Sequence, residues 1–338
     1  MRIAVLGLGF MGSTHLKAMR DLAGLELAAV CSIDERELSG DLTSVQGNLG
    51  GPGEKLDFSG VRQYREIEPL LADPAIDAVD ICLPTDLHER TAVEALRAGK
   101  HVLVEKPMAL DGFGADRMLN AARRANRVLM TAHVLRFFPE YTALGDALAG
   151  GKLGRVRYAM FRRRCAAPAW GGWLHDPERS GGGVFDLLIH DADMCLHLFG
   201  KPETVSACGV ADPHTGVDCI GARLLYADGG VVLISGGWHA PGEYPFSMEY
   251  SVALDGGTVE FSSLGRAPTL YPRNAPARAL PLETRDAYAA EIEYFAACCR
   301  EKRAPERCPP AESALAVKLM LLLLDSRKRN GAQMPCNL

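Results

Sequence analysis

Residues 2–12 read Arg2-Ile3-Ala4-Val5-Leu6-Gly7-Leu8-Gly9-Phe10-Met11-Gly12, and this stretch decides the fold of the first half of the chain. A short apolar strand runs directly into a glycine-rich turn, and a helical pattern follows. Glycines at this spacing allow a tight turn, close approach of the main chain to a pyrophosphate, and close packing of helix on sheet. The start of the helix then offers N–H groups to an anion. The stretch therefore predicts dinucleotide binding by Gly7, Gly9, Phe10, Met11 and Gly12.

Short apolar strands and helical patterns alternate through the rest of this half. Further strands are expected at 26–31, 78–83, 101–104 and 128–132, and helices at 13–21, 88–98 and 114–124. Such alternation predicts a doubly wound parallel sheet with helices on both faces, a Rossmann fold. Residues 41–60 are rich in Gly, Ser and Asp and are expected to form a loop insertion.

The pattern changes after about residue 134. A helix is expected at 139–149, and longer strands follow, joined by hairpin turns at Asp228-Gly229-Gly230 and Asp255-Gly256-Gly257. These features predict a second α/β domain with an open, mainly antiparallel sheet.

The length of 338 residues suits two domains. We assign residues 1–133 to an NAD(P)-binding Rossmann domain and residues 134–338 to a second α/β domain. Helices expected between about 286 and 328 are predicted to pack back toward the first domain.

Composition and charge exclude several classes of function. The net charge is -5, and the densest basic run is Arg162-Arg163-Arg164, which argues against nucleic acid binding. The cysteines include no C-x-x-C pair and the N-terminus shows no export pattern, so we expect a reduced, cytoplasmic protein. The apolar run 315–324 is interrupted by Lys318 and is shorter than a bilayer needs, so no membrane association is expected.

The end of the second strand should carry the residue that distinguishes NAD from NADP. An acid there bonds the ribose 2′-hydroxyl of NAD, whereas an arginine accommodates the 2′-phosphate of NADP. The sequence reads Val30-Cys31-Ser32-Ile33-Asp34-Glu35-Arg36. Asp34 suits NAD, Ser32 with Arg36 suits NADP, and a third interpretation has residues 34–36 only solvating the next helix. The choice between NAD and NADP stays open.

The strand at 101–104 runs into Glu105-Lys106-Pro107. Ligands of an open α/β sheet lie outside the carboxyl ends of its strands, so Lys106 is predicted to face the cofactor, with Glu105 beside it. Pro107 stiffens the turn, and a lysine held there would bond a substrate hydroxyl and stabilise a developing alkoxide. The alternative is a surface lysine that follows a strand.

Four blocks occur in the order typical of one family. They are Gly7-Leu8-Gly9-Phe10-Met11-Gly12, Leu83-Pro84-Thr85-Asp86-Leu87-His88, Glu105-Lys106-Pro107 and Gly181-Gly182-Gly183-Val184-Phe185-Asp186-Leu187-Leu188-Ile189-His190. With these blocks the chain resembles the Gfo/Idh/MocA family, which includes glucose-fructose oxidoreductase and inositol dehydrogenase, over essentially its whole length. The resemblance implies hydride transfer between a nicotinamide and a hydroxyl carbon of a sugar, inositol or related polyol. It also implies that Lys106 is the active-site lysine and that Asp186 and His190 bind substrate and transfer the proton. By the same resemblance, residues 134–338 form the substrate-binding and oligomerisation domain.

The chemistry of these residue types agrees with those roles. Asp186 and His190 are four apart on an expected helix and share one face, and Asp193 falls on the same side, where it would orient the imidazole. A histidine with a pKa of ~6.5 takes and returns a proton near neutral pH. The alternative for His190 is a structural histidine on an amphipathic helix.

Two further groups of residues are candidates for the site. Leu83, Pro84, Thr85 and His88 follow another strand end and are expected to line the nicotinamide crevice, although His88 would also suit a helix cap.

Aromatic residues precede the third glycine-containing block. Trp173 would either wall the sugar pocket or belong to the core, and the same holds for Trp170 and His175. His15, on the first helix, is expected to be packed rather than catalytic. No metal site is expected.

Three features depart from the family pattern. Ser32 stands where many members have Asp, His197 stands where relatives often have a large aromatic residue, and residues 41–60 are longer than usual. Two other functions of the same fold stay open, an NAD-dependent glycosidase and a non-catalytic NAD(P)-sensing protein. A homo-oligomer, dimer or tetramer, is expected to form through the open sheet.

Overall fold

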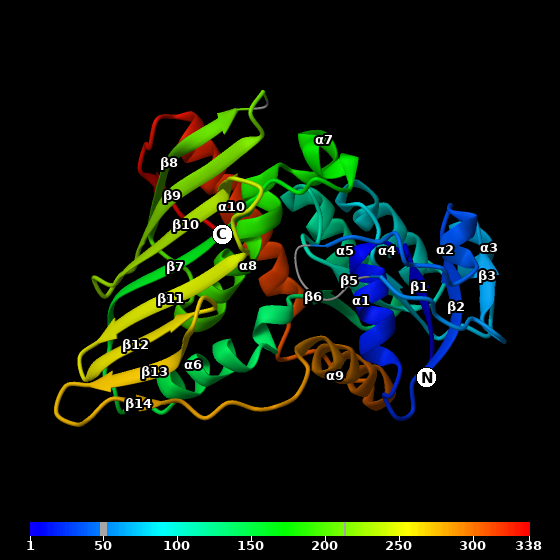
Figure 1. Cartoon of the computed structure of the whole chain (residues 1–338), viewed down its shortest axis with the longest axis horizontal. Helices are drawn as coiled ribbons and strands as arrows, with labels where there is room; N and C mark the ends of the chain where they lie inside the picture. The colour runs from blue at the N-terminus through cyan, green and yellow to red at the C-terminus, as the bar shows by residue number, and fades with distance from the viewer. Residues whose placement is uncertain (48–52, 213) are drawn as a thin grey trace. The chain divides into compact units, whose positions relative to one another are not determined.

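The structure, a computed structural model, describes residues 1–47, 53–212 and 214–338. It divides into two compact units, each with its own sheet (Figure 1). The first unit comprises Met1–Val134 and Arg285–Ala314, and the second comprises Leu135–Thr284 and Leu315–Leu338. The segments beyond residue 284 therefore belong to units that begin much earlier in the sequence.

The first unit contains a six-stranded parallel sheet with the order β3-β2-β1-β4-β5-β6. Its strands are β1 (Arg2–Leu6), β2 (Glu26–Cys31), β3 (Arg62–Tyr64), β4 (Ala78–Ile81), β5 (His101–Glu105) and β6 (Leu129–Ala132). The strand order reverses between β1 and β4. In doubly wound sheets, ligands bind at such a switch point, outside the carboxyl ends of the strands.

Strands such as β4 and β6 are buried along their whole length, which indicates that both faces of this sheet are covered. The helices are α1 (Phe10–Met19), α2 (Glu35–Leu38), α3 (Ile67–Ala72), α4 (His88–Arg97), α5 (Gly112–Ala125) and α9 (Ala287–Glu301). Helix α1 packs against α9, whereas α4 packs against α3 and α5. The late helix α9 is thus an integral part of the first unit.

The second unit contains a nine-stranded sheet with the order β14-β13-β12-β11-β7-β10-β9-β8-β15. Its strands are β7 (Val156–Ala166), β8 (Thr204–Asp212), β9 (Val217–Leu225), β10 (Val231–Ala240), β11 (Ser247–Leu254), β12 (Gly257–Ser262), β13 (Arg266–Pro272), β14 (Arg278–Ala279) and β15 (Met334–Pro335). The central strands β7 and β10 pair in parallel, and the other neighbours pair antiparallel.

Three longer helices belong wholly or partly to the second unit. They are α6 (Pro139–Ala149), α8 (Gly183–Phe199) and α10 (Pro310–Lys328), and the short α7 (Pro177–Ser180) precedes α8. Helix α8 packs on β7, β9 and β10, and α6 packs on β13. Helix α8 therefore covers the central strands of the second sheet.

The architecture confirms the predicted fold class. The two predicted hairpins join β9 to β10 and β11 to β12, and Gly229 adopts the φ of +84° that its turn requires. The short elements β3 and α3 were not predicted, because elements of three and six residues are too short to show a clear periodicity. In the 41–60 segment, Asp41 and Lys55 form an isolated bridge, and residues 48–52 lie outside the described residues.

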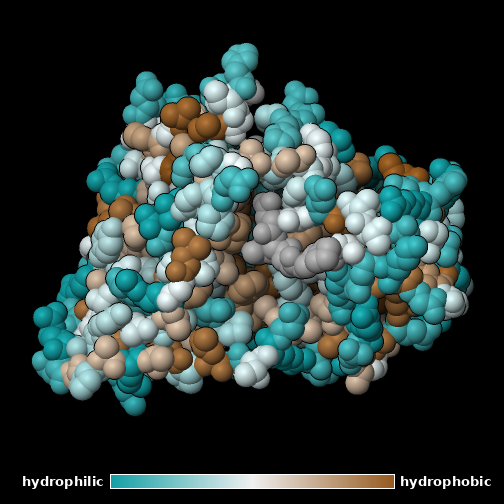
Figure 2. Space-filling model, viewed as in Figure 1, coloured by the Kyte–Doolittle hydropathy of each residue, from teal (hydrophilic) through white to brown (hydrophobic). Residues whose placement is uncertain are grey.

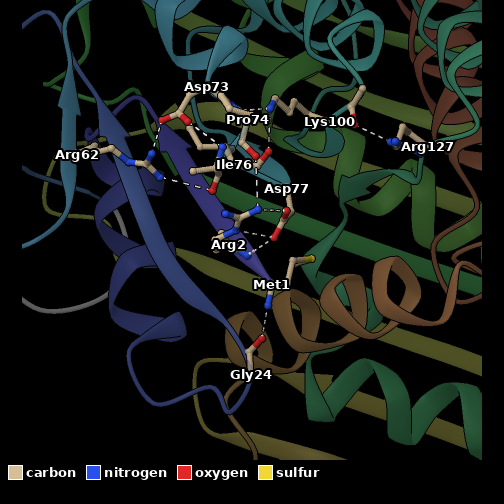
Figure 3. A network of polar contacts seen from close by, with 12 residues as sticks. Met1, Arg2, Gly24, Arg62, Asp73, Pro74, Ile76, Asp77, Lys100 and Arg127 are labelled. Carbon is tan, nitrogen blue, oxygen red and sulfur yellow. Dashed lines mark hydrogen bonds and ion pairs between the residues drawn. The ribbon is translucent and has the colours of Figure 1, made fainter.

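A polar network ties the amino ends of the strands in the first unit (Figure 3). Arg2 donates to the carboxylate of Asp77 from its main-chain N–H and from Nη2, both at 2.8 Å. Lys100 donates to two carbonyl oxygens of the turn before β4, at 2.6 and 2.8 Å. Arg62 pairs with Asp73 in the same turn. These contacts join β1, β3, β4 and the start of β5 at the end of the sheet away from the glycine loop.

The surface is chemically mixed. On the face seen in Figure 2, polar side chains cover most of the area and apolar ones form small separate groups. No helix within the described ranges combines the length and apolarity that a bilayer crossing requires.

Candidate active site

The glycine loop joins β1 to α1, and each glycine has a different reason to be there. Gly7 has φ +88°, and a Cβ there would lie 2.6 Å from the carbonyl oxygen that follows β4. A Cβ on Gly12 would lie 1.9 Å from the Gly7 carbonyl oxygen, so α1 packs on the turn only without a side chain. An added Cβ on Gly9 would meet no atom within 4 Å, so the main chain is open to a ligand at this position. Phe10 and Met11 follow in the first turn of α1. The loop has the turn, the packing and the open approach that a pyrophosphate needs.

Helix α2 places an acid, Glu37, beside the end of β2, which the sequence pattern did not indicate. Ser32 is buried, and its hydroxyl donates to the carboxylate of Glu37 at 2.5 Å. Asp34 caps α2 by accepting the N–H of Arg36 at 2.8 Å, and its own N–H donates to Ser32. The Arg36 guanidinium donates to Asp41 at 3.2 Å. Asp34 thus acts as a helix cap, and Glu37 places a carboxylate beside the strand end, five residues after Ser32.

The turn after β4 carries Leu83, Pro84, Thr85 and His88. Thr85 and His88 are buried, and Leu83 and Pro84 are half-buried. The two ring nitrogens of His88 lie 2.8 Å from the carbonyl oxygens of Pro107 and Leu83. Burial lowers the pKa of His88, and its bonds to these carbonyls act in the opposite direction. His88 ties the turn after β4 to the turn after β5, a role that the sequence did not indicate.

The turn after β5 holds Lys106. Glu105 ends the strand, and its Oε2 accepts the N–H of Lys106 at 3.0 Å. Lys106 is half-buried and is joined to Pro107 by a cis peptide bond. His15 of α1 is fully buried, with Nδ1 2.8 Å from Asp80 and Nε2 3.2 Å from Glu105. His15 is therefore packed, as expected, but it is packed between two carboxylates.

The charges of this group support one another. Burial is the largest single influence and opposes a charge on His15, but Asp80 and Cys82 together outweigh it, so the pKa of His15 is raised well above its usual value. Burial likewise opposes a charge on Glu105, but His15, Lys106 and His88 together outweigh it, so the pKa of Glu105 is lowered. The pKa directions favour an imidazolium and a carboxylate at neutral pH.

His15, Asp80 and Cys82 also form a group of potential ligand atoms within 4.8 Å of one another, the one such group among the described residues. Two ligands of a tetrahedral zinc ion lie about 3.3 Å apart. The 2.8 Å separation of His15 and Asp80 is shorter and suits a hydrogen bond. We therefore interpret the group as a hydrogen-bonded ion pair with a neighbouring thiol.

In the second unit, α8 presents Asp186 and His190 on one stripe. Every residue between Gly183 and Leu196 is buried except these two. A Cβ on Gly183 would lie 2.5 Å from the ring of Trp238 on β10, so this glycine lets α8 approach the sheet. The helix and the shared face agree with the sequence prediction.

Two buried ion pairs hold the middle of α8. Arg136 donates to both carboxylate oxygens of Asp193 at 2.8 and 2.7 Å, and Arg163 donates to both oxygens of Asp191 at 2.7 and 3.2 Å. Removing one partner of such a pair costs about 3–5 kcal/mol, because the other charge stays buried. Asp193 therefore fixes Arg136, a contact that spacing along the helix did not indicate.

The remaining candidates lie around α8. Trp173 is half-buried on η3 (Gly172–His175), and Trp170 is half-buried just before it, so the pocket role and the core role both stay predictions. His197 is exposed near the end of α8.

Comparison with protein-family models assigns both parts of the chain. Residues 1–133 match the model described as "Oxidoreductase family, NAD-binding Rossmann fold", and residues 141–260 match the model described as "GFO/IDH/MocA C-terminal domain".

Individual proteins agree with that assignment. The chain is 28% identical to Myo-inositol 2-dehydrogenase of Thermotoga maritima, over 98% of this chain and 96% of that protein. It is 42% identical to 1,5-anhydro-D-fructose reductase of Ensifer adhaerens, but that match covers only 39% of this chain and 40% of the reductase. Its fold is similar to that of aldose-aldose oxidoreductase from Caulobacter crescentus, with a TM-score of 0.85, 21% identity and 99% of both chains covered. The chain therefore belongs to the Gfo/Idh/MocA family of NAD(P)-dependent oxidoreductases that act on CH–OH donors.

Proposed function

We propose that the protein transfers hydride between NAD or NADP and a hydroxyl or carbonyl carbon of a sugar, an inositol or a related polyol. The observation that carries the proposal is the pair Asp186 and His190, two polar groups left accessible on an otherwise buried stretch of α8. Relatives named as inositol and anhydrosugar oxidoreductases support this substrate class.

In this proposal the first 133 residues bind the nucleotide. The glycine loop takes the pyrophosphate, the end of β2 takes the adenosine ribose, and the turns after β4 and β5 take the nicotinamide side. The residues assigned to the cofactor are Gly7, Gly9, Phe10, Met11, Gly12, Ser32, Asp34, Arg36, Leu83, Pro84, Thr85, His88, Glu105 and Lys106.

Residues 134–338 bind the substrate, with Trp173 as a wall of the pocket. The open sheet of this part is assigned to the contact between copies of the chain.

Three side chains carry the reaction. Lys106 bonds the substrate oxygen and stabilises the charge that develops on it. Asp186 holds the substrate hydroxyl toward His190, whose imidazole accepts the hydroxyl proton during oxidation. A bound nicotinamide would supply the acceptor for the hydride that leaves the same carbon. The substrate carbon becomes a carbonyl, His190 holds the hydroxyl proton, and in the reductive direction His190 returns that proton.

The proposal is tested with a panel of inositols, aldoses and sugar acids, each assayed with NAD and with NADP. Lys106→Ala and His190→Ala are expected to lower kcat/KM for the accepted substrate at least about 100-fold. His197→Ala, on the exposed end of the same helix, is the matched control and is expected to keep activity. Wild-type rates in Lys106→Ala or His190→Ala refute the residue assignment. Glycoside cleavage without net NADH formation refutes the dehydrogenase assignment.

A further inference from the structure

Three ionisable side chains meet beside the Lys106 turn, and the proposed reaction does not use them. They are His15 from α1, Asp80 from β4 and Glu105 from β5, and 0%, 0% and 7% of their side-chain surfaces are exposed. His15 Nδ1 is hydrogen-bonded to Asp80 at 2.8 Å, and Nε2 makes an ion-pair contact with Glu105 at 3.2 Å. Because little water reaches these groups, each buried charge requires an opposite charge beside it.

Two carboxylates require a cation between them. A neutral imidazole donates through one nitrogen, whereas an imidazolium donates through both and carries a positive charge. Nδ1 is hydrogen-bonded to Asp80, and Nε2 lies 3.2 Å from Glu105 Oε1 outside hydrogen-bond geometry, so the positive charge of an imidazolium suits both contacts. The raised pKa of His15 agrees with this geometry.

The groups that face His15 from other elements are neutral or acidic. Cys82, directly after β4, has its sulfur 3.6 Å from His15 Nδ1, and burial raises the pKa of its thiol. Tyr288 on α9 has its ring centroid 6.1 Å from that of His15, and burial raises the pKa of its hydroxyl. Glu291, one turn further along α9, is also buried.

Glu105 connects this charge group to the main chain of Lys106. One carboxylate oxygen faces His15, and the other accepts the N–H of Lys106 at 3.0 Å. After Lys106, the carbonyl oxygen of Pro107 lies 2.8 Å from His88 Nδ1. The main chain is thus held on both sides of Lys106, which reduces the ordering that substrate binding has to supply.

We propose that His15 is a positioning residue for the reaction. Held as a buried cation by Asp80, it keeps the carboxylate of Glu105 on the Lys106 amide and so sets where the Lys106 ammonium meets the substrate. The inference rests on the role proposed above for Lys106. His15 itself touches neither substrate nor cofactor in this account.

The first test is the protonation state of His15 in the wild-type protein, because it requires no turnover. Protein labelled with 15N in its histidine rings is examined by NMR at pH 8, and His15 is assigned by its through-space contact with Tyr288. We expect protons on both ring nitrogens, whereas an ordinary histidine with a pKa of ~6.5 is neutral at this pH. A neutral ring overturns the proposal. A stoichiometric metal in the purified protein overturns it as well.

The second test separates kcat from KM across pH. In His15→Gln the Glu105 carboxylate loses its nearest buried cation and keeps Lys106, so its pKa rises and its protonated form holds the Lys106 amide less well. We expect kcat to fall roughly 10- to 100-fold at pH 6, and the loss to shrink toward pH 9. The KM for the cofactor should stay near its wild-type value. The matched control is His101→Gln at the amino end of β5, where the ring accepts the N–H of Val128, and it should keep the wild-type profile.

A loss of kcat that is equal at every pH, or a cofactor KM that rises in step with it, overturns the positioning role. If His15→Gln does not fold, Glu105→Gln replaces it, because the amide still accepts the Lys106 N–H but carries no charge. A wild-type kcat in Glu105→Gln then overturns the proposal. An inactive Lys106→Ala combined with a neutral His15 refutes this inference alone, whereas an active Lys106→Ala refutes the proposed function.

Discussion

Asp77 lies just before β4 and Asp80 lies within it. Both carboxylates pair with a cation, but the first pair is partly exposed to water and the second is buried. Asp77 pairs with Arg2 at 2.8 Å, with 39% and 40% of the two side chains exposed (Figure 3). Asp80 pairs with His15 at the same distance, and neither side chain is exposed. If Asp77 loses Arg2 at the amino end of the sheet, water can solvate its carboxylate. If Asp80 loses His15 inside the sheet, no water reaches the carboxylate. Equal distances therefore carry very different energies.

The largest effect is expected from Asp80→Asn. The substitution keeps an acceptor oxygen for His15 but removes the carboxylate charge, and breaking such a buried ion pair costs about 3–5 kcal/mol of unfolding free energy. Urea unfolding, followed by circular dichroism at neutral pH, measures the change. A loss below about 1 kcal/mol, the size of an exposed pair, would remove the distinction between the two aspartates.

The same variant sharpens the comparison through pH. The pKa of His15 is raised in the folded protein, so its stabilising contribution is complete below the unfolded value of ~6.5 and is lost as pH rises through the folded value. The gap in unfolding free energy between wild type and Asp80→Asn should therefore be widest below pH 6.5 and narrow above it. A gap that widens with rising pH would show that His15 is not the cation.

A somewhat smaller effect is expected in the glycine loop at the carboxyl end. Gly12→Ala forces a Cβ to within 1.9 Å of a main-chain oxygen, so the loop must shift, and nucleotide-dependent kcat/KM should fall on the order of 10²-fold. Thermal stability should fall with it. Gly9→Ala is the control, because its Cβ meets no protein atom within 4 Å. Gly9→Ala should keep the wild-type melting temperature and lose nucleotide binding, measured by calorimetry. A Gly9→Ala protein that melts earlier but still binds the nucleotide would show that the pyrophosphate does not lie at Gly9.

The next effect concerns the end of β2. Glu37→Gln keeps a partner for Ser32 but removes a negative charge that repels a 2′-phosphate. The ratio of kcat/KM with NADP to kcat/KM with NAD should rise about 10-fold, which is the effect of ~1.4 kcal/mol. Glu35→Gln, on an exposed side chain paired with Arg65, should leave the ratio unchanged. If the NADP-to-NAD ratio of kcat/KM were the same in Glu37→Gln as in Glu35→Gln, the adenosine ribose would not lie beside Glu37.

The smallest effect is expected from Asp77→Asn. Its partner Arg2 is partly solvated, so the unfolding free energy should change by only about 0.2–1 kcal/mol, and less at high salt. Urea unfolding in low and high salt measures it. A loss comparable to that of Asp80→Asn would mean that the amino-end network of Figure 3 acts as a buried unit.

Local patterns predicted a large part of this molecule. The strand and glycine turn at residues 2–12 are contiguous, so their periodicity and spacing carry the fold. The hairpins at Asp228 and Asp255 are equally local. The parallel pairing of β7 with β10 was beyond such reasoning, because some 70 residues separate strands that carry no mark of their partner.

The candidate site divides in the same way. Asp186 and His190 share a face because four residues make about one helical turn, and this spacing is visible in the sequence. The contacts of His15 with Asp80 and Glu105 span 65 and 90 residues, and only the assembled sheet brings them together. A lone histidine on a helix gives no sign of the charge that tertiary packing imposes on it.

The placement of α9 has a consequence for the order in which the chain is made. The first unit begins at Met1 but includes Arg285–Ala314, and α9 packs against α1. During synthesis, residues 1–134 leave the ribosome first, yet α1 waits for its partner until about 150 further residues have been added. The nucleotide-binding unit is therefore the first to start folding, but its helical cover is completed only after nearly all of the second sheet has been translated.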